Sequence, residues 1–357
     1  MKKTALFDKH KSLGAKIVDF AGFLMPVSYT SVNDEHIHVR NKVGMFDVSH
    51  MGEIEISGID STKYVNYICS NDILKLKVGK AQYNCILNNN GGIIDDLIVY
   101  KLEERKYLLV VNASNLSKDL EWIISNAKGF DCTINDLSNE ISLLAIQGPD
   151  SETLCKDYTE LDISSLSNYS FYQGKFGGID NIIISKTGYT GAGGYELYIK
   201  NEDVEKIWDL LINSKNADLL PIGLAARDTL RIEMGYCLYG NDINEKTNPI
   251  QANLNWITKT ETKFIGHEAI IDKINNGTED KLIGFKFLEK GIPRKGYQLY
   301  NIDKKLIGYV TSGTFSPILK IGIGLGYIKD EYLDDKLIFI KIRDNFLKAE
   351  ITKTPFI

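Results

Sequence analysis

The sequence predicts an α+β protein in which two mixed regions of helices and strands precede a small all-β domain. Its 357 residues exceed the size at which one hydrophobic core keeps growing, so two or three domains are expected. Residues 52–139 follow the order strand, helix, three strands, helix, which indicates an antiparallel sheet. From Lys281 onward the chain changes to short apolar runs separated by glycines, a pattern typical of a small β domain.

The first region opens with a helix that we expect over 32–43, with Gly44 as its C-cap. His36 and His38 stand two residues apart and diverge around this helix, so a metal site built from them is not expected. Residues 53–58 alternate between polar and apolar, which predicts a half-exposed strand. The elements expected after it are a helix at 60–68, strands at 83–87, 93–100 and 107–112, and a helix at 119–127.

The second region begins at Ile141 with a buried type of strand that ends at the Gly148-Pro149 break. A helix is expected over 223–233, and the boundary to the all-β domain is expected between Asn241 and Glu279. The strands expected in that last domain are 282–287, 305–311, 321–327 and 337–342.

The composition is that of a soluble globular enzyme, with 43% hydrophobic and 25% charged residues. A net charge of −5 does not indicate a nucleic-acid partner, because proteins that bind nucleic acids are typically basic. No apolar run is long enough to span a membrane, and the first ten residues lack the apolar core of a signal peptide. The five cysteines are scattered and form no close pair typical of a zinc or redox motif. We therefore expect a cytoplasmic protein without a membrane partner.

Two carboxylates interrupt the apolar segment 91–100, which reads Gly-Gly-Ile-Ile-Asp-Asp-Leu-Ile-Val-Tyr. Neighbouring strand residues point to opposite faces, so Asp95 and Asp96 lie on different faces that are otherwise apolar. A buried ionised carboxylate costs several kcal/mol unless it is paired or hydrogen-bonded. Two interpretations stay open: one Asp faces a polar pocket or ligand, or both lie at a solvated strand entrance after a hairpin turn at Gly91-Gly92.

The glycine-rich segment 186–196 fits neither common nucleotide-binding motif. It lacks the Gly-Lys-Ser/Thr of a Walker loop and the spacing of a dinucleotide fingerprint, and it leads into a strand and not a helix. Glycines nevertheless allow the backbone to approach a flat ligand closely, with Tyr189 available for stacking and Glu196 at the start of the strand. The alternative is an ordinary hairpin turn.

Arg227 and Arg231 stand four residues apart, which places both on one face of the expected helix. Two like charges there are unfavourable unless an acidic group meets them. Asp228 and Glu233 are candidates within the helix, and a solvated helix face is the alternative.

Taken in order, these segments closely resemble the T-protein family of the glycine cleavage system, whose members are folate-dependent aminomethyltransferases. Each motif is short, and the specificity lies in their order and spacing along nearly the whole chain. The motifs that carry the resemblance are residues 20–27, 44–52, 79–83, 91–100, 110–113, 188–196 and 227–241.

The resemblance implies an α+β fold of three domains arranged as a cloverleaf around a central folate channel. Two of them would be α+β domains with antiparallel sheets, and the third a C-terminal β-barrel or jelly-roll-like domain. Residues 1–51 and 140–240 would form a discontinuous folate-binding domain, residues 52–139 an inserted domain, and residues 241–357 a linker and the all-β domain.

The resemblance also implies the reaction and its participants. The family moves the methylene of an aminomethyl group from the lipoyl arm of the H protein to tetrahydrofolate and releases ammonia. The implied partner is thus the lipoylated H protein and the implied co-substrate tetrahydrofolate, with no metal, flavin or nicotinamide.

By the same resemblance, Asp96 is the catalytic carboxylate and Asp95 its structural neighbour. Glu196 matches the residue that accepts hydrogen bonds from the donor edge of the pterin, and Arg227 the residue at the acceptor side of the ring. The residues that match the lining of the pocket are Tyr189, Tyr83, Asn112 and Met51.

The chain departs from the family at two places. Ala192-Gly193 replaces the usual Glu-Asp of the loop, and the chain stops at Ile357, where many members continue with a basic or aromatic tail. We therefore expect a less acidic loop and no folate contact from such a tail.

Several relatives are alternatives to the aminomethyltransferase. One is another folate-dependent demethylase, or the folate half of a sarcosine or dimethylglycine dehydrogenase, although this chain leaves no room for a flavin domain. A second is a folate-binding relative associated with tRNA modification, whose Lys-Gly-Cys-Tyr motif is absent here. A third is a scaffold that binds the H protein without turnover.

Overall fold

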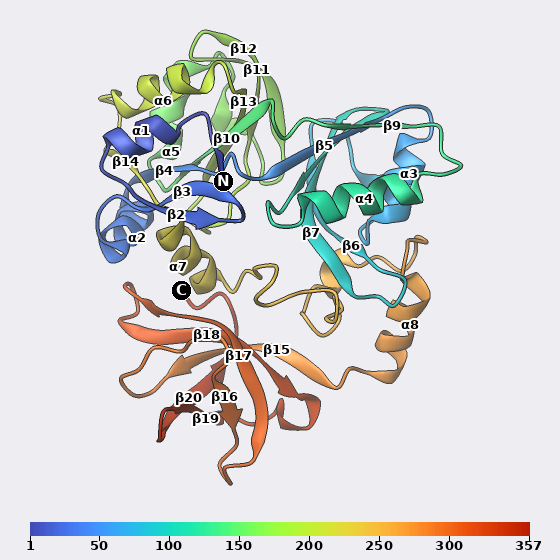
Figure 1. The fold of residues 1–357 in the computed structure, drawn as a ribbon, viewed down its shortest axis with the longest axis vertical. Helices are drawn as coiled ribbons and strands as arrows, with labels where there is room; N and C mark the ends of the chain where they lie inside the picture. Colours follow the sequence, from blue (N-terminus) through green and yellow to red (C-terminus); the bar gives the residue numbers. More distant parts are fainter. The chain divides into compact units, whose positions relative to one another are not determined.

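The computed structural model describes residues 1–357 and divides the chain into two compact units (Figure 1). The first unit contains residues 1–65, 73–83 and 97–228, and the second contains residues 66–72, 84–96 and 229–357. The predicted α+β class is confirmed, with antiparallel sheets and an all-β barrel at the C-terminal end.

A six-stranded sheet forms the centre of the first unit, in the order β11-β12-β13-β10-β4-β14. Every neighbouring pair is antiparallel except β14 and β4, which are parallel. Helices α5 and α6 pack on this sheet, and Trp208 of α6 lies in its core at 1% exposure. The strands are β4 (Val43–Asp47), β10 (Ile141–Gln147), β11 (Phe171–Phe176), β12 (Ile179–Ser185), β13 (Gly194–Lys200) and β14 (Leu219–Pro221), and the helices are α5 (Ser151–Cys155) and α6 (Val204–Ile212).

The N-terminal segment adds a three-stranded sheet, in the order β1-β3-β2, and helix α2. The expected C-cap at Gly44 is wrong: α2 is capped by Lys42, and Gly44 lies inside β4. A Cβ atom at Gly44 would lie 2.4 Å from Cγ1 of Ile222, so the glycine serves close packing. The elements are β1 (Lys2–Lys3), α1 (Phe7–Ser12), β2 (Lys16–Phe20), β3 (Phe23–Ser28) and α2 (Val32–Asn41).

A five-stranded sheet has the order β6-β7-β8-β5-β9. Its elements follow the predicted order of strand, helix, three strands and helix, and β9 adds an edge strand beside β5. Helix α4 lies along this sheet in Figure 1. The elements are β5 (Gly52–Ser57), α3 (Ser61–Ile68), β6 (Ala81–Leu87), β7 (Ile93–Glu103), β8 (Lys106–Val111), α4 (Leu116–Asn126) and β9 (Thr133–Asp136).

The second unit contains a closed barrel, β15-β18-β17-β16-β19-β20, which confirms the predicted all-β character of this region. Phe285 and Phe287 of β15 contribute to its core at 0% and 2% exposure. The barrel strands are β15 (Asp280–Phe287), β16 (Gln298–Tyr300), β17 (Leu306–Ser316), β18 (Ile321–Lys329), β19 (Leu337–Ile342) and β20 (Asn345–Thr352). Helix α8 (His267–Asn276) precedes the barrel, and α7 (Leu224–Met234) runs from the first unit into the second.

A buried ion pair connects the end of α7 with the barrel. Nη1 of Arg231 lies 2.7 Å from Oδ2 of Asp242, and the two side chains are 1% and 0% exposed. Thr311 and Ser312 of β17 donate further hydrogen bonds to the same carboxylate. The solvated face considered for this arginine is therefore wrong, because its charge is matched inside the protein. Removing one partner of such a pair costs about 3–5 kcal/mol.

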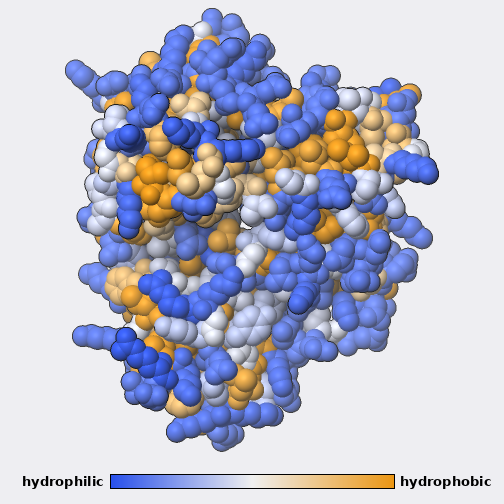
Figure 2. Space-filling model, viewed as in Figure 1, coloured by the Kyte–Doolittle hydropathy of each residue, from blue (hydrophilic) through white to orange (hydrophobic).

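Hydrophilic side chains cover most of the face seen in Figure 2, with several hydrophobic areas among them. None of the helices combines the length and the apolar character that crossing a lipid bilayer requires.

Candidate functional site

Glu196 is a buried carboxylate in the middle of the six-stranded sheet. It lies on β13 between Ser185 of β12 and Ala145 of β10, and 8% of the residue is exposed. Its Oε2 accepts a hydrogen bond of 2.5 Å from Oγ1 of Thr187. Burial raises the pKa of Glu196 above its ordinary value, while the charge of Arg227 and the hydrogen bond from Thr187 oppose this rise. The site thus combines a desolvated acceptor with groups that favour its ionised form.

The glycine-rich loop brings β13 close to its neighbour β10. Gly194 has a φ of +135°, and a Cβ atom there would lie 2.2 Å from the carbonyl oxygen of Ile146. Only glycine meets both requirements. The loop joins the antiparallel strands β12 and β13, so the hairpin considered from the sequence is present. It also carries Tyr189, as expected for a ligand-binding loop.

Arg227 and Tyr189 form a cation–π pair in the first unit. The guanidinium carbon of Arg227 lies 4.9 Å from the centre of the Tyr189 ring. Its Nη1 is buried and has no hydrogen-bond partner. Burial lowers the pKa of Arg227, and the charge of Glu196 opposes this change. A cation, an aromatic ring and a carboxylate are therefore neighbours, and one guanidinium donor remains without a partner.

This group of Glu196, Arg227 and Tyr189 is complementary to a flat heterocycle with a donor edge and an acceptor edge. A carboxylate accepts two parallel hydrogen bonds, and a guanidinium donates to a ring oxygen or nitrogen. An unpartnered buried donor such as Nη1 of Arg227 costs free energy until a ligand meets it. The residues present thus fit a pterin.

Asp95 and Asp96 lie on β7 in its part that belongs to the second unit. Asp95 is fully buried and Asp96 is partly exposed, so a solvated strand entrance for both acids is wrong. The start of the strand is fixed in the same unit, since the amide of Ile93 donates to the carbonyl of Thr247 at 2.9 Å. Burial raises the pKa of the Cys85 thiol, and the nearby Asp96 raises it further. Asp96 is thus a partly exposed carboxylate with buried neighbours.

Met51, Asn112 and Tyr83 are partly exposed residues of the first unit. Gly52 pairs with Val111, so Met51, which precedes β5, and Asn112, which follows β8, lie at adjacent strand ends. Tyr83 lies on β6. Contact of these three residues with a ligand stays a prediction.

Four residues around the Glu196 group were not predicted from the sequence. Thr187, Tyr100 and Tyr198 supply hydroxyl groups around the carboxylate. His50 is buried, and burial together with the charge of Arg227 lowers its pKa to about 4, so the imidazole is neutral. One signal was available: Tyr198 stands two residues after Glu196 on a strand, so both side chains lie on one face.

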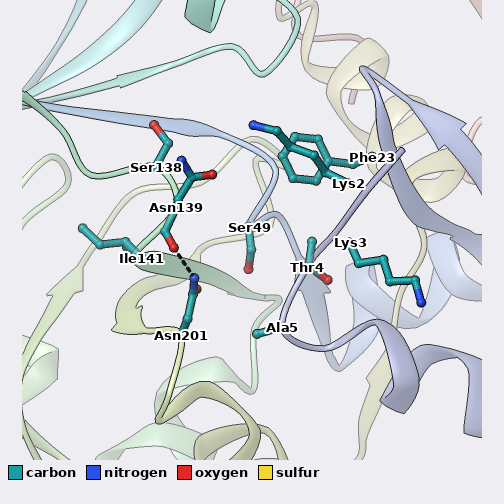
Figure 3. A pocket seen from close by; sticks show the side chains of 10 residues that line it. All are labelled: Lys2, Lys3, Thr4, Ala5, Phe23, Ser49, Ser138, Asn139, Ile141 and Asn201. Carbon is teal, nitrogen blue, oxygen red and sulfur yellow. Dashed lines mark hydrogen bonds between the residues drawn. The ribbon is translucent and has the colours of Figure 1, made fainter.

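A separate pocket of about 290 Å³ opens in the first unit, and none of the predicted site residues lines it (Figure 3). Two of its polar residues bond each other, since Nδ2 of Asn201 donates to the carbonyl of Asn139 at 2.8 Å, and Thr4 donates to Asp47 outside the pocket. Lys2 lies over the Phe23 ring, with its nitrogen 5.5 Å from the ring centre. We therefore assign the site to the Glu196 group and not to this pocket.

Two family models match the chain. The GCVT N-terminal domain matches residues 6–262, and the glycine cleavage T-protein C-terminal barrel domain matches residues 281–357.

Curated relatives and a solved structure extend this similarity over the full length. The aminomethyltransferase of Flavobacterium psychrophilum is 49% identical, and the similarity covers 100% of this chain and 99% of the relative. The aminomethyltransferase of Thermosipho melanesiensis is 46% identical, and the similarity covers 100% of this chain and 97% of the relative. The crystal structure of glycine cleavage system aminomethyltransferase T from Bartonella henselae has a TM-score of 0.93 at 31% identity, and covers 100% of this chain and 98% of its own.

A second buried carboxyl group lies in the five-stranded sheet. Glu53 of β5 is 0% exposed, and neither of its carboxylate oxygens has a hydrogen-bond partner. Burial raises the pKa of Glu53 well above its ordinary value, and the charge of Asp136 adds to the rise. Glu53 is therefore a neutral acid over a wider range of pH than an exposed glutamate.

We expect Glu53→Gln to change how stability depends on pH. The unfolded chain ionises this group near pH 4.3, whereas the folded chain keeps it protonated. Its contribution to stability is therefore present at low pH and is lost as pH rises toward the folded pKa. Gln removes this loss, so the stability of the variant relative to the parent should rise between pH 5 and pH 8, by about 1.4 kcal/mol for each pH unit below the folded pKa. Urea unfolding at both pH values measures the gain.

The matched control for this experiment is Glu55→Gln on the same strand, because Glu55 is partly exposed and pairs with Lys106 at 2.9 Å. This control should show no gain at pH 8. Equal pH profiles for Glu53→Gln and the parent protein would contradict a raised pKa at Glu53.

Proposed function

Since the chain belongs to the glycine cleavage T-protein family, we propose that it transfers the methylene of an aminomethyl group to tetrahydrofolate and releases ammonia. It is an aminomethyltransferase of the glycine cleavage system. The donor in this proposal is the aminomethyl group on the lipoyl arm of the H protein. The reaction requires neither a metal nor a flavin or nicotinamide in this proposal.

The observation that carries the proposal is the buried group of Glu196, Arg227 and Tyr189. Its carboxylate suits the guanidine-like donor edge of a pterin, and its unpartnered Nη1 suits the acceptor side of the ring. The Tyr189 ring, already in contact with the guanidinium, offers an aromatic face. We further assign Met51, Tyr83 and Asn112 to the lining of the folate pocket.

Asp96 is the catalytic carboxylate in this proposal. Forming a methylene bridge between two folate nitrogens passes through iminium-like species that carry positive charge. A fixed carboxylate in a water-poor pocket stabilises that charge electrostatically. The same group is able to orient the arylamine nitrogen or to accept its proton, which typically contributes about 10²–10⁴ in rate. Asp95, which is fully buried, is then a structural neighbour.

The cysteines support a reducing location such as the cytoplasm. All five thiols are free, and four of them are buried. Burial raises the pKa of Cys69, Cys85, Cys155 and Cys237, so these thiols are poor nucleophiles for disulfide exchange.

The reaction itself provides the test of this function. Purified protein is incubated with aminomethylated H protein, and ammonia release is measured with and without tetrahydrofolate. We expect release that depends strictly on tetrahydrofolate. Transfer of a one-carbon unit from a methylated amine to tetrahydrofolate, with no ammonia released from the H protein, would instead identify a folate-dependent demethylase. Folate binding without any release would identify a non-catalytic relative.

Asp96→Asn should lower turnover in this assay at least tenfold while folate binding stays largely intact. The amide keeps the shape of the side chain but neither carries the charge nor accepts the proton. Calorimetry with tetrahydrofolate checks binding, and Glu103→Gln at the exposed end of the same strand is the matched control. Near-normal turnover in the Asp96 variant would remove this residue from the catalytic role.

Glu196→Ala should raise the Kd for tetrahydrofolate severalfold or more, because the variant loses both acceptors for the pterin edge. A charge-assisted bidentate pair is among the stronger hydrogen-bonded contacts. Isothermal titration calorimetry measures the change, with the exposed Glu202→Gln as the control. An unchanged Kd would place the pterin elsewhere.

A further inference from the structure

Hydroxyl groups in the first unit form a continuous chain of hydrogen bonds that ends at Glu196. The phenol of Tyr198 donates to the phenol of Tyr100 at 2.9 Å, and Tyr100 lies 3.1 Å from Oγ1 of Thr187. Thr187 in turn donates to Oε2 of Glu196 at 2.5 Å. Ser185 joins the chain through a contact of 2.9 Å with Thr187. Tyr100 and Ser185 are 0% exposed and Tyr198 is 4% exposed, so this end of the chain is shielded from water, whereas Thr187 is partly exposed.

The protons of this chain have one consistent direction. Each hydroxyl owns a single proton, and an ionised carboxylate only accepts. Thr187 therefore donates to Glu196, and its oxygen accepts from Tyr100. Tyr198 donates to Tyr100 and completes the series. Aligned hydrogen bonds of this kind polarise one another toward the carboxylate.

Among the groups linked by these hydrogen bonds, Glu196 is the one whose protonation changes near neutral pH. Arg227, Tyr100 and Tyr198 face the carboxylate, and all three keep one charge state near neutral pH, since burial raises the pKa of both phenols. Beyond them lie His50, near Arg227, and Glu53, near Tyr198. Both are neutral for the reasons given above.

We propose that Thr187, Tyr100 and Tyr198 are positioning residues for the pterin, because their hydroxyl chain holds Glu196 as an ionised, oriented acceptor for the ligand's donor edge. This inference rests on the proposed function. Thr187 donates a hydrogen bond to one oxygen of the Glu196 carboxylate. The donors of the ligand then meet a carboxylate whose rotation and charge are already set. A protonated Glu196 would instead present its own donor to the pterin donors.

The test measures tetrahydrofolate affinity by calorimetry between pH 5.5 and 8.5 for Thr187→Val, Tyr100→Phe and Tyr198→Phe. Loss of a hydrogen bond to the ionised form raises the pKa of Glu196, so less of the binding form is present at low pH. We expect the Kd of Thr187→Val to rise at least threefold at pH 6, and the ratio to the parent to shrink toward pH 8.5. The effect should decrease from Thr187 to Tyr100 to Tyr198.

Two controls separate this role from a general loss of structure. Thr187→Ser keeps the hydroxyl and should restore the parent pH profile. Tyr195→Phe removes another buried phenol of the same strand, one that donates to the carbonyl of Ile163 at 3.1 Å, and should leave the profile unchanged.

The outcomes are distinguishable. A change in affinity that is equal at every pH, or a rise as large in Tyr195→Phe, would overturn the positioning role, as would unchanged affinity in all three chain variants. Parent protein that does not bind tetrahydrofolate at all would contradict the proposed function itself.

Discussion

A carboxyl group buried inside a sheet is the constraint around which this site is built. Glu196 is 8% exposed, and burial alone favours its neutral form. The protein opposes that tendency with a cation, Arg227, and with a donor, Thr187. Gly194 at the start of β13 contributes as well, because a side chain there would collide with the carbonyl of Ile146 on β10. Loop, helix and strand thus all shape the surroundings of one carboxyl group.

Each unit contains its own buried carboxylate network. In the second unit, Asp242 accepts from Arg231, Thr311 and Ser312 and joins α7 to the barrel. In the first unit, Asp47 at the end of β4 accepts from His10 at 2.8 Å and from the amide of Ser49 at 2.9 Å. Burial would raise the pKa of Asp47, but these hydrogen bonds and the charge of His10 lower it.

The Asp47 network matters for the site because it fixes the turn that follows β4. That turn leads through His50 and Met51 into β5, which carries Glu53. A buried acid with satisfied oxygens, Asp47, and one without partners, Glu53, therefore lie a few residues apart. The first supports the fold, and the second makes stability depend on pH.

Much of the fold follows from local patterns, whereas the partners inside the site do not. Alternation and glycine punctuation predicted four strands of the five-stranded sheet, β10 and β13 of the six-stranded sheet and four strands of the barrel, because these signals act over a few residues. Gly44 was misjudged since its role depends on Ile222, far along the chain. Tyr100 and Thr187 are 87 residues apart, and their hydrogen bond exists only once β7 and the end of β12 have come together. Pairing of this kind requires the tertiary structure.

The choice of hydroxyls beside Glu196 has a physical logic that a second cation would not satisfy. A lysine or arginine at Thr187 would hold the carboxylate ionised more strongly, but an arginine would engage both oxygens through its fork. The ligand's own donors would then have to displace it. A threonine supplies one proton to one oxygen and leaves the remaining lone pairs for two parallel bonds. The tyrosines behind it strengthen that single bond from inside the protein. In the proposed role, a neutral relay would thus favour the ionised form of Glu196 while its binding edge stays open, and would leave Arg227 to act on the ligand's acceptor side.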